Sequence, residues 1–385
     1  FSALAAGGTI ICTQYLGQKN HEMANKSARQ ALFIITAISV FIVVLGLAFR
    51  APLLSFIFGK VDADVMENSM VYFFYTVLSY PFIALYDAGA SIFRAQENTR
   101  GPMVISIISN VMNIVGNGIL IWVFHMGVAG AAISTLVSRI FCAVVVLYQL
   151  RKNRQPIVVR DYLKIRPDGK MIGRILALGI PSGIENSMFQ LGKLAIQSTV
   201  STLGTTAIAA QAMTNMLEML NGTAVIGVGI GLMTVVGQSL GAGKKDEAVY
   251  YMKKLMIFSE VFLIACCAVV YVLARPITMI GGMEAKSAEM CLDMMFWITI
   301  VKPIVWMFAF IPAYGMRAAG DVKFSMITSC ITMWTFRFCL CVYLIRVCGM
   351  GPMAVWIGMF TDWTVRAIVF GLRFKSGKWM EHKVV

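Results

Sequence analysis

Apolar runs of about 20 residues recur along nearly the whole sequence. A helix needs about 20 residues to cross a hydrocarbon layer of about 30 Å. Backbone amides in lipid must be hydrogen-bonded within their own segment, so we expect helices rather than the short alternating strands of a β-barrel. The sequence predicts an all-α polytopic membrane protein with a partial span at 1–16 and complete spans at 31–57, 68–93, 102–124, 127–150, 173–202, 205–240, 254–281, 288–316, 324–346 and 350–372.

The distribution of charge follows these spans. Hydrophobic residues make up 58% of the chain and charged residues 14%, with a formal net charge of +14. Most of the Lys and Arg lie in alternate loops, which the positive-inside rule places, together with the C-terminus, in the cytoplasm. We therefore attribute the basic charge to membrane orientation and expect no nucleic-acid partner. The nine Cys form no C-x-x-C pair, so we expect them to pack in the spans and to form no structural metal site.

The sequence contains an internal repeat. QYLGQKNHEMANK from Gln14 returns as QSLGAGKKDEAVY from Gln238, 224 positions later. Two further pairs of segments match at almost the same offset. Such a repeat indicates two parallel halves related by a pseudo-two-fold axis along the membrane normal. The further pairs are IFRAQENTRGPMVIS from Ile92 with GMRAAGDVKFSMITS from Gly315, and GVAGAAIS from Gly127 with GPMAVWIG from Gly351.

The repeat also predicts the domain organisation. We expect an N-lobe at 1–150, a cytoplasmic linker at 151–171, a C-lobe at 172–373 and a cytoplasmic tail at 374–385. Aligning the halves places the start of the N-lobe roughly 50 residues before Phe1. We therefore expect two six-helix lobes, with the first helix and part of the second missing from the sequence.

Several segments resemble the multidrug and toxin extrusion (MATE) family. They are RAQENTRGPM, GVAGAAIST, ALGIPSGIENSMFQLGK and the two Q-x-L-G turns. The resemblance covers the whole chain. It implies a secondary antiporter with a V-shaped pair of lobes that exports organic cations in exchange for protons or sodium ions by alternating access. It also implies no enzymatic activity, no cofactor, and a monomer in the bacterial inner membrane.

Two polar stripes lie in the predicted C-lobe spans. Residues at i, i+4, i+7 and i+11 share one face of a helix, so two such stripes predict a wet cavity. Glu218 is expected about four residues deeper than Lys193, roughly 6 Å, which long side chains can bridge. We predict a Lys193–Glu218 pair, acting either in ion coupling or as a purely structural salt bridge. The stripes are Asn186, Gln190, Lys193 and Gln197, followed by Gln211, Asn215, Glu218 and Asn221.

Glu185 lies beside the first stripe, near the expected middle of the bilayer. A carboxylate at this depth can exchange a proton or bind Na⁺ against substrate, and Glu185 is our first candidate for the coupling residue. The alternative is a hydrogen bond to a neighbouring helix without titration. The resemblance implies a helix-ten Asp partner in sodium-coupled members, but Trp306 stands at the comparable position. It implies a first-helix Asp in proton-coupled members, and that helix is absent, so the coupling ion stays open.

The N-lobe carries a stripe of its own, made of Ser106, Asn110, Asn113 and Asn117. Uncharged amides can hydrogen-bond varied substrates without the desolvation cost of a charge, which suits a polyspecific cavity. Buried Asn side chains that join two helices are the alternative reading.

Two other functions stay open. A lipid or lipid-linked oligosaccharide flippase of the same superfamily requires a deep basic cavity. Against it, Lys193 and Lys302 are the only intramembrane Lys, and we expect the intramembrane Arg to be scattered. A non-transporting receptor or scaffold is the second alternative, which the two polar stripes and Glu185 disfavour. The intramembrane Arg are Arg50, Arg139, Arg337 and Arg366.

Overall fold

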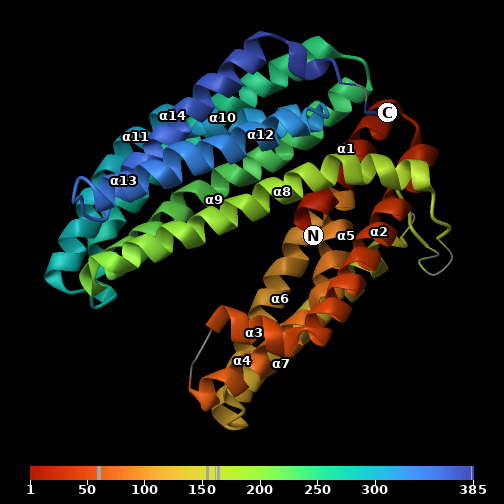
Figure 1. The fold of residues 1–385 in the computed structure, drawn as a ribbon. Helices are drawn as coiled ribbons and strands as arrows, with labels where there is room; N and C mark the ends of the chain where they lie inside the picture. The colour runs from red at the N-terminus through yellow and green to blue at the C-terminus, as the bar shows by residue number, and fades with distance from the viewer. Residues whose placement is uncertain (59–61, 153–155, 161, 163–164, 383) are drawn as a thin grey trace. The chain divides into compact units, whose positions relative to one another are not determined.

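The computed structural model describes residues 1–385 except 59–61, 153–155, 161, 163–164 and 383. Within this part of the chain every regular element is a helix (Figure 1). Nine of the described helices are long and apolar enough to cross a membrane. The prediction of an all-α polytopic membrane protein is confirmed. Parts of the predicted linker 151–171 and residue 383 of the predicted tail lie outside the described residues.

The chain divides into two compact units, Phe1–Ile180 and Pro181–Val385. In the first unit, α1, α2 and α5 pack against one another, and α4, α5 and α6 pack against α7. The helices are α1 (Ser2–Gly17), α2 (His21–Ala48), α3 (Arg50–Phe58), α4 (Ala63–Leu78), α5 (Tyr80–Ala95), α6 (Arg100–Gly118) with the π-helix η1 (Ile119–Val123), α7 (Gly127–Leu150), and the start of α8 (Gly169–Val200).

The second unit begins inside α8 and contains the remaining helices. Here α9, α10 and α11 pack against one another, α14 packs against α11, and the π-helix η4 joins α12 to α13 and packs against α14. The elements after α8 are the 3₁₀-helix η3 (Ser201–Leu203), α9 (Thr205–Gly241), α10 (Lys245–Ile280), α11 (Ala285–Ala318), α12 (Val322–Thr332), η4 (Met333–Cys339), α13 (Leu340–Arg346), α14 (Met353–Lys375) and the 3₁₀-helix η5 (Lys378–Met380).

Several helix ends differ from the predicted spans because polar turns begin the helices. α2 begins at His21 rather than residue 31, where the Asn20 side chain accepts a hydrogen bond from the backbone N–H of Met23. α10 begins at Lys245 rather than 254, with Asp246 and Glu247 in its first turn, where acids favour the helix dipole. The predicted span 173–202 is α8, whose polar residues, Asn186 and Gln190 among them, keep it out of the set of apolar helices.

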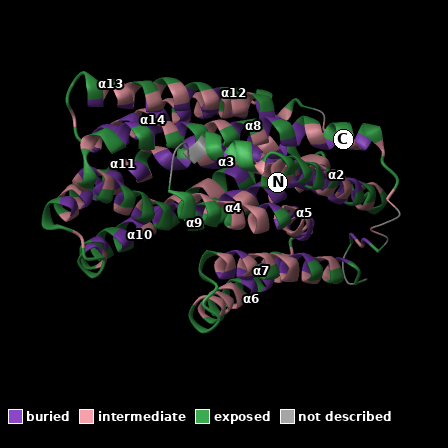
Figure 2. Ribbon diagram, turned by 60° about the horizontal axis from the view of Figure 1, so that its bottom comes forward, coloured by how far each residue is buried: buried purple, intermediate pink, exposed green. Residues whose placement is uncertain are grey.

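Large apolar side chains are exposed on many of these helices, as a surface in contact with lipid requires. Figure 2 shows buried, intermediate and exposed residues alternating along the helices. Trp122 is 79% exposed, Val272 72% and Leu372 64%. The helices therefore bury one side and present the other, apolar as well, to the membrane.

The start of α8 is fixed by Asp168. Its Oδ1 accepts hydrogen bonds from the backbone N–H groups of Lys170 and Met171, and its Oδ2 lies 2.5 Å from Nζ of Lys26. The Lys26 ammonium and these N–H groups hold the pKa of the Asp168 carboxyl below its ordinary value. The contact therefore supports the fold above that ordinary pKa and is lost as the pH falls through the lowered one.

The repeat extends to the backbone of its turns. Three turns of the first unit place a non-glycine residue at positive φ: Lys19 (59°), Glu97 (63°) and His125 (51°). The residues 223 or 224 positions later are Gly243 (76°), Gly320 (91°) and Gly349 (66°). Both halves thus use the same left-handed turns, but only the second half places glycine there, where a side chain costs about 1–2 kcal/mol.

We predict that Lys19→Gly stabilises the protein. Removing the Cβ relieves the left-handed strain, and the added freedom of the unfolded chain offsets part of the gain, leaving about 0.5–1 kcal/mol. The matched control is Gly243→Ala, which should lower stability by a similar amount, since no atom lies within 4 Å of the added Cβ. Thermal unfolding in detergent measures both. A lower Tm for Lys19→Gly would contradict the prediction.

Candidate functional site

A cavity of about 340 Å³ lies wholly within the second unit, among α8, α9, α11, α12, η4 and α14. Its lining combines aromatic rings with ionisable side chains. Charged groups inside membrane-spanning helices are costly, and their gathering around one cavity marks a functional site. The aromatic residues of the lining are Phe189, Trp306, Phe310, Tyr314, Trp363 and Phe370, and the charged ones are Glu185, Lys193, Glu218, Arg317, Arg337 and Arg366.

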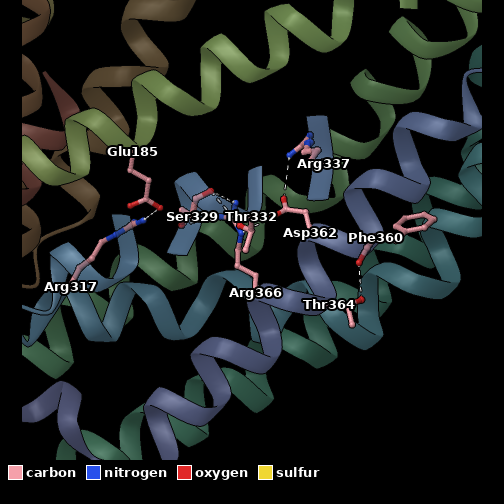
Figure 3. A network of polar contacts seen from close by, with 9 residues as sticks. All are labelled: Glu185, Arg317, Ser329, Thr332, Arg337, Phe360, Asp362, Thr364 and Arg366. Atoms are coloured by element: carbon pink, nitrogen blue, oxygen red, sulfur yellow. Dashed lines mark hydrogen bonds and ion pairs between the residues drawn. The ribbon is translucent and has the colours of Figure 1, made fainter. Parts of the chain in front are cut away.

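Glu185 of α8 forms an ion pair with Arg317, in the last turn of α11. The Arg317 guanidinium donates to Glu185 Oε1 at 2.7 Å (Figure 3). The Ser325 hydroxyl donates to Glu185 Oε2 at 3.4 Å. The Glu185 side chain is 9% exposed. The pair therefore links α8 to α11 and α12 and leaves one carboxylate at the edge of the cavity.

Glu218 of α9 forms the second ion pair, and its partner is Lys302 of α11. The Lys302 ammonium donates to Glu218 Oε1 at 2.5 Å, to the Glu218 carbonyl oxygen at 3.0 Å and to Asn221 Oδ1 at 2.6 Å. All three of its N–H donors are thus used. The Lys302 side chain is 0% exposed and that of Glu218 is 20% exposed. Lys302 is therefore a fully buried cation, and Glu218 supplies its counter-charge.

The third cluster centres on Asp362 and Arg366, one turn apart on α14. Arg366 Nε donates to Asp362 Oδ1 at 3.2 Å, and its terminal nitrogens donate to the hydroxyl and carbonyl oxygens of Ser329. Arg337 of η4 lies 4.0 Å from Asp362 Oδ2 (Figure 3). Asp362 is 0% exposed, so this cluster is a buried network with more cationic than anionic charge.

The structure brings four of the predicted C-lobe residues to the cavity: Glu185, Asn186, Lys193 and Glu218. The predicted Lys193–Glu218 pair is replaced by Lys302–Glu218, and Lys193 Nζ lies over the Phe189 ring, 5.5 Å from its centroid. The prediction compared only two helices that follow one another in sequence. α11 packs against α9 and supplies the nearer cation.

The remaining C-lobe residues are placed elsewhere. Gln190 and Gln197 are exposed on α8, and Asn215 is exposed on α9. Gln211 is buried, where its amide accepts a hydrogen bond from the Trp356 indole and donates to Asn215. These four residues are outside the lining of the cavity, and their assignment to a substrate path stays a prediction.

In the first unit the predicted stripe joins two helices. The Asn113 amide donates to the Thr135 hydroxyl at 3.2 Å, and the Asn117 amide donates to Asn113 Oδ1 at 3.3 Å. Ser134 of α7 donates to the Asn113 carbonyl oxygen. Asn110 is exposed on α6. The contacts of Asn113 and Asn117 match the packing alternative, and a role of the stripe in binding substrate stays a prediction.

Sequence reasoning missed the clustering of arginines. Arg337 and Arg366 were expected to be scattered, and this was wrong, since both line the cavity with Arg317. One signal was present: Asp362 and Arg366 have opposite charges one turn apart within an apolar span, a spacing that pairs side chains. Among the described residues, no three His, Cys, Asp or Glu side chains gather as a metal site requires.

Apolar spans on many helices and a charged cavity enclosed by several of them are typical of a polytopic membrane transporter. The MatE family model matches residues 1–119 and 181–343. The chain belongs to the MatE family. It is 25% identical to a probable multidrug resistance protein NorM of Thermotoga maritima, over 100% of this chain and 82% of that protein.

Two solved structures share the fold. One is an outward-facing multidrug resistance MATE family transporter of the MOP superfamily, with a TM-score of 0.90 and 18% identity over 98% of this chain and 84% of that chain. The other is a MOP superfamily transporter from Pyrococcus furiosus Vc1, described as having a binding pocket of reversed polarity that suggests a different function. Its TM-score is 0.91 at 17% identity, over 99% of this chain and 85% of that chain. The resemblance to the MATE family is confirmed, and the chain is a membrane transporter rather than an enzyme.

Proposed function

We propose that the chain is a secondary antiporter that exports drug-like organic molecules, organic cations among them, in exchange for protons or sodium ions by alternating access. The observation that carries this proposal is a carboxylate, Glu185, held at the wall of a cavity inside the spanning helices. The name of the Thermotoga maritima relative supports multidrug export. No bound cofactor is needed for this cycle.

The Glu185–Arg317 pair supplies a coupling mechanism. A proton or Na⁺ that binds the Glu185 carboxylate competes with the Arg317 guanidinium for the same oxygens. Arg317 and the neighbouring rings then reorganise, and this changes the wall that a substrate contacts. Because the ion and the substrate bias the same side chains, the affinity for one depends on the presence of the other.

The proposal includes the cellular membrane in which the protein works and its orientation in that membrane. The basic loops and the C-terminus lie in the cytoplasm of a bacterial cell, and the protein works in the inner membrane as a monomer. Accessibility of single cysteines introduced into the loops, labelled from one side of the membrane, measures this orientation.

A second candidate function is supported by one observation. Five cations, Lys193, Lys302, Arg317, Arg337 and Arg366, lie in or beside one cavity. A deep basic cavity is what a flippase for lipid phosphates requires. The three carboxylates in the same place favour the antiporter, because a flippase needs no ion-exchanging acid.

The test is efflux of a fluorescent organic cation in everted vesicles, first under an imposed proton gradient and then under a sodium gradient. Vesicles without the protein are the control. We expect accumulation under one gradient and none when that gradient is collapsed, which names the coupling ion. Absence of transport under both gradients would contradict the antiporter and favour the flippase.

A further inference from the structure

The charged groups around the cavity do not balance. The cations number five, as given above, and the carboxylates are Glu185, Glu218 and Asp362, so the net charge is five minus three, or +2. Each carboxylate has a close cation of its own: Arg317 at 2.7 Å, Lys302 at 2.5 Å and Arg366 at 3.2 Å. Lys193 and Arg337 are the cations that remain.

Arg337 is a buried cation with spare hydrogen-bonding capacity. Its side chain is 7% exposed, and its closest carboxylate is Asp362 at 4.0 Å, which is already bonded to Arg366. Its Nε is buried and has no hydrogen-bond partner. A buried donor without a partner lowers stability, and native structures rarely leave one unsatisfied. A ligand acceptor is the group that this site lacks.

Both surplus cations lie near the Phe189 ring, as Arg366 also does. Lys193 Nζ lies 5.5 Å from the Phe189 centroid, and the Arg337 guanidinium lies 5.0 Å from it. The position of Arg337 is fixed by close packing, because a Cβ on Gly358 would lie 2.8 Å from the Arg337 carbonyl oxygen. A ring face attracts a cation electrostatically but does not neutralise its charge. The positive potential of Lys193 and Arg337 therefore persists at the cavity wall.

We infer that Lys193 and Arg337 form a subsite for the anionic group of an amphipathic ligand, a carboxylate, phosphate or sulfonate. The aromatic or aliphatic body of the ligand packs on Trp306, Phe310 and Trp363. The inference rests on the proposed function in taking this cavity as the one that binds exported molecules. Charge-assisted bonds from Arg and Lys favour an anionic group at this subsite, and like-charge repulsion keeps the positive group of a ligand away from it.

The test is calorimetric titration of the purified full-length chain in neutral detergent, which needs no gradient. The probes are 1-naphthoate and 1-naphthylmethylammonium, which share a ring system and differ in charge. We expect naphthoate to bind at least about tenfold more tightly, and Lys193→Gln to weaken it about tenfold, the loss of one charge-assisted bond. Lys254→Gln is the matched control, since Lys254 is exposed and lies over the Tyr250 ring outside the cavity.

Arg337→Gln is the second variant and should abolish naphthoate binding; unchanged thermal unfolding confirms that the variant is folded. Dihexanoyl phosphatidic acid, set against dihexanoyl phosphatidylcholine, tests whether the anionic group is a lipid headgroup. Lys193-dependent binding of phosphatidic acid without binding of naphthoate assigns the subsite to lipid phosphates. Lys193-dependent binding of naphthoate without binding of phosphatidic acid assigns it to soluble organic anions.

Equal or tighter binding of the ammonium probe, or naphthoate affinity unchanged in Lys193→Gln, would overturn the subsite. The binding test of the subsite and the transport test of the antiporter can fail independently of each other. Naphthoate binding that depends on Lys193 in a protein that transports nothing under either gradient keeps the subsite and rejects the antiport. Gradient-driven cation export with no Lys193-dependent binding of naphthoate or of phosphatidic acid keeps the antiport and rejects the subsite.

Discussion

Glu185→Gln is expected to reduce gradient-driven transport to the level of vesicles that lack the protein. Glutamine has nearly the same shape and can still hydrogen-bond Ser325 and Arg317, but it cannot take up a proton and is a weak Na⁺ ligand. Removing the exchanged charge therefore removes the coupling and leaves the cavity in place. Initial rates of substrate accumulation in everted vesicles, under whichever gradient drives the wild type, measure the effect.

Glu260→Gln is the matched control. Glu260 lies within the spanning part of α10 and is outside the lining of the cavity, so its substitution should preserve transport. The double variant Glu185→Gln/Arg317→Gln removes both charges and separates lost coupling from misfolding around an unpaired arginine. A wild-type transport rate in Glu185→Gln would show that the coupling site is elsewhere, with Glu218 the next candidate.

Glu218→Leu is expected to destabilise the protein by about 3–5 kcal/mol, because it leaves a buried cation without its counter-charge. Lys302 is 0% exposed and cannot reach water without rearrangement of α9 and α11. Lys302→Met should cost less, because the Glu218 side chain is 20% exposed and retains some hydration. Unfolding in mixed micelles of increasing denaturing detergent measures these differences.

The double variant Glu218→Leu/Lys302→Met completes the cycle. Replacing both charges with apolar groups of similar volume is neutral or stabilising in many buried pairs. We therefore expect the double variant to be more stable than Glu218→Leu alone, with a coupling energy of about 0.5–3 kcal/mol. If the stability lost in the double variant equals the sum of the losses in the two single variants, the coupling energy is zero and the ion pair does not support the fold.

Much of the fold was predictable because hydropathy and the repeat are local properties of the sequence. The apolar runs located the long helices, and the offset between Gln14 and Gln238 related turns that share a left-handed residue. Hydropathy failed at Asn20 and at Lys245, because polar first turns continue a helix beyond its apolar part. Helix starts therefore require the capping residues as well as the apolar pattern.

The site was less predictable because it depends on which helices pack together. Glu185 and Glu218 were selected as single acids in apolar spans, and both reach the cavity. Their partners, Arg317 and Lys302, come from α11, about 130 and 84 residues away in sequence. Comparing depths only along two consecutive spans pairs Glu218 with Lys193. Contacts with a helix so distant in sequence cannot be found in this way.

The two surplus positive charges have a consequence for energetics across the membrane. One elementary charge moved through the whole membrane potential changes in free energy by about 2.3 kcal/mol per 100 mV. An anion bound at Lys193 and Arg337 cancels one of the two charges, so the empty and the loaded cavity respond to voltage differently. In a cell with a negative interior, the potential opposes the outward step of the loaded cavity, which carries one surplus positive charge. It favours the inward return of the empty cavity, which carries two, and this second effect is the larger. The membrane potential would then add to the driving force for export of anions, and transport rates in vesicles clamped at different potassium diffusion potentials would reveal it.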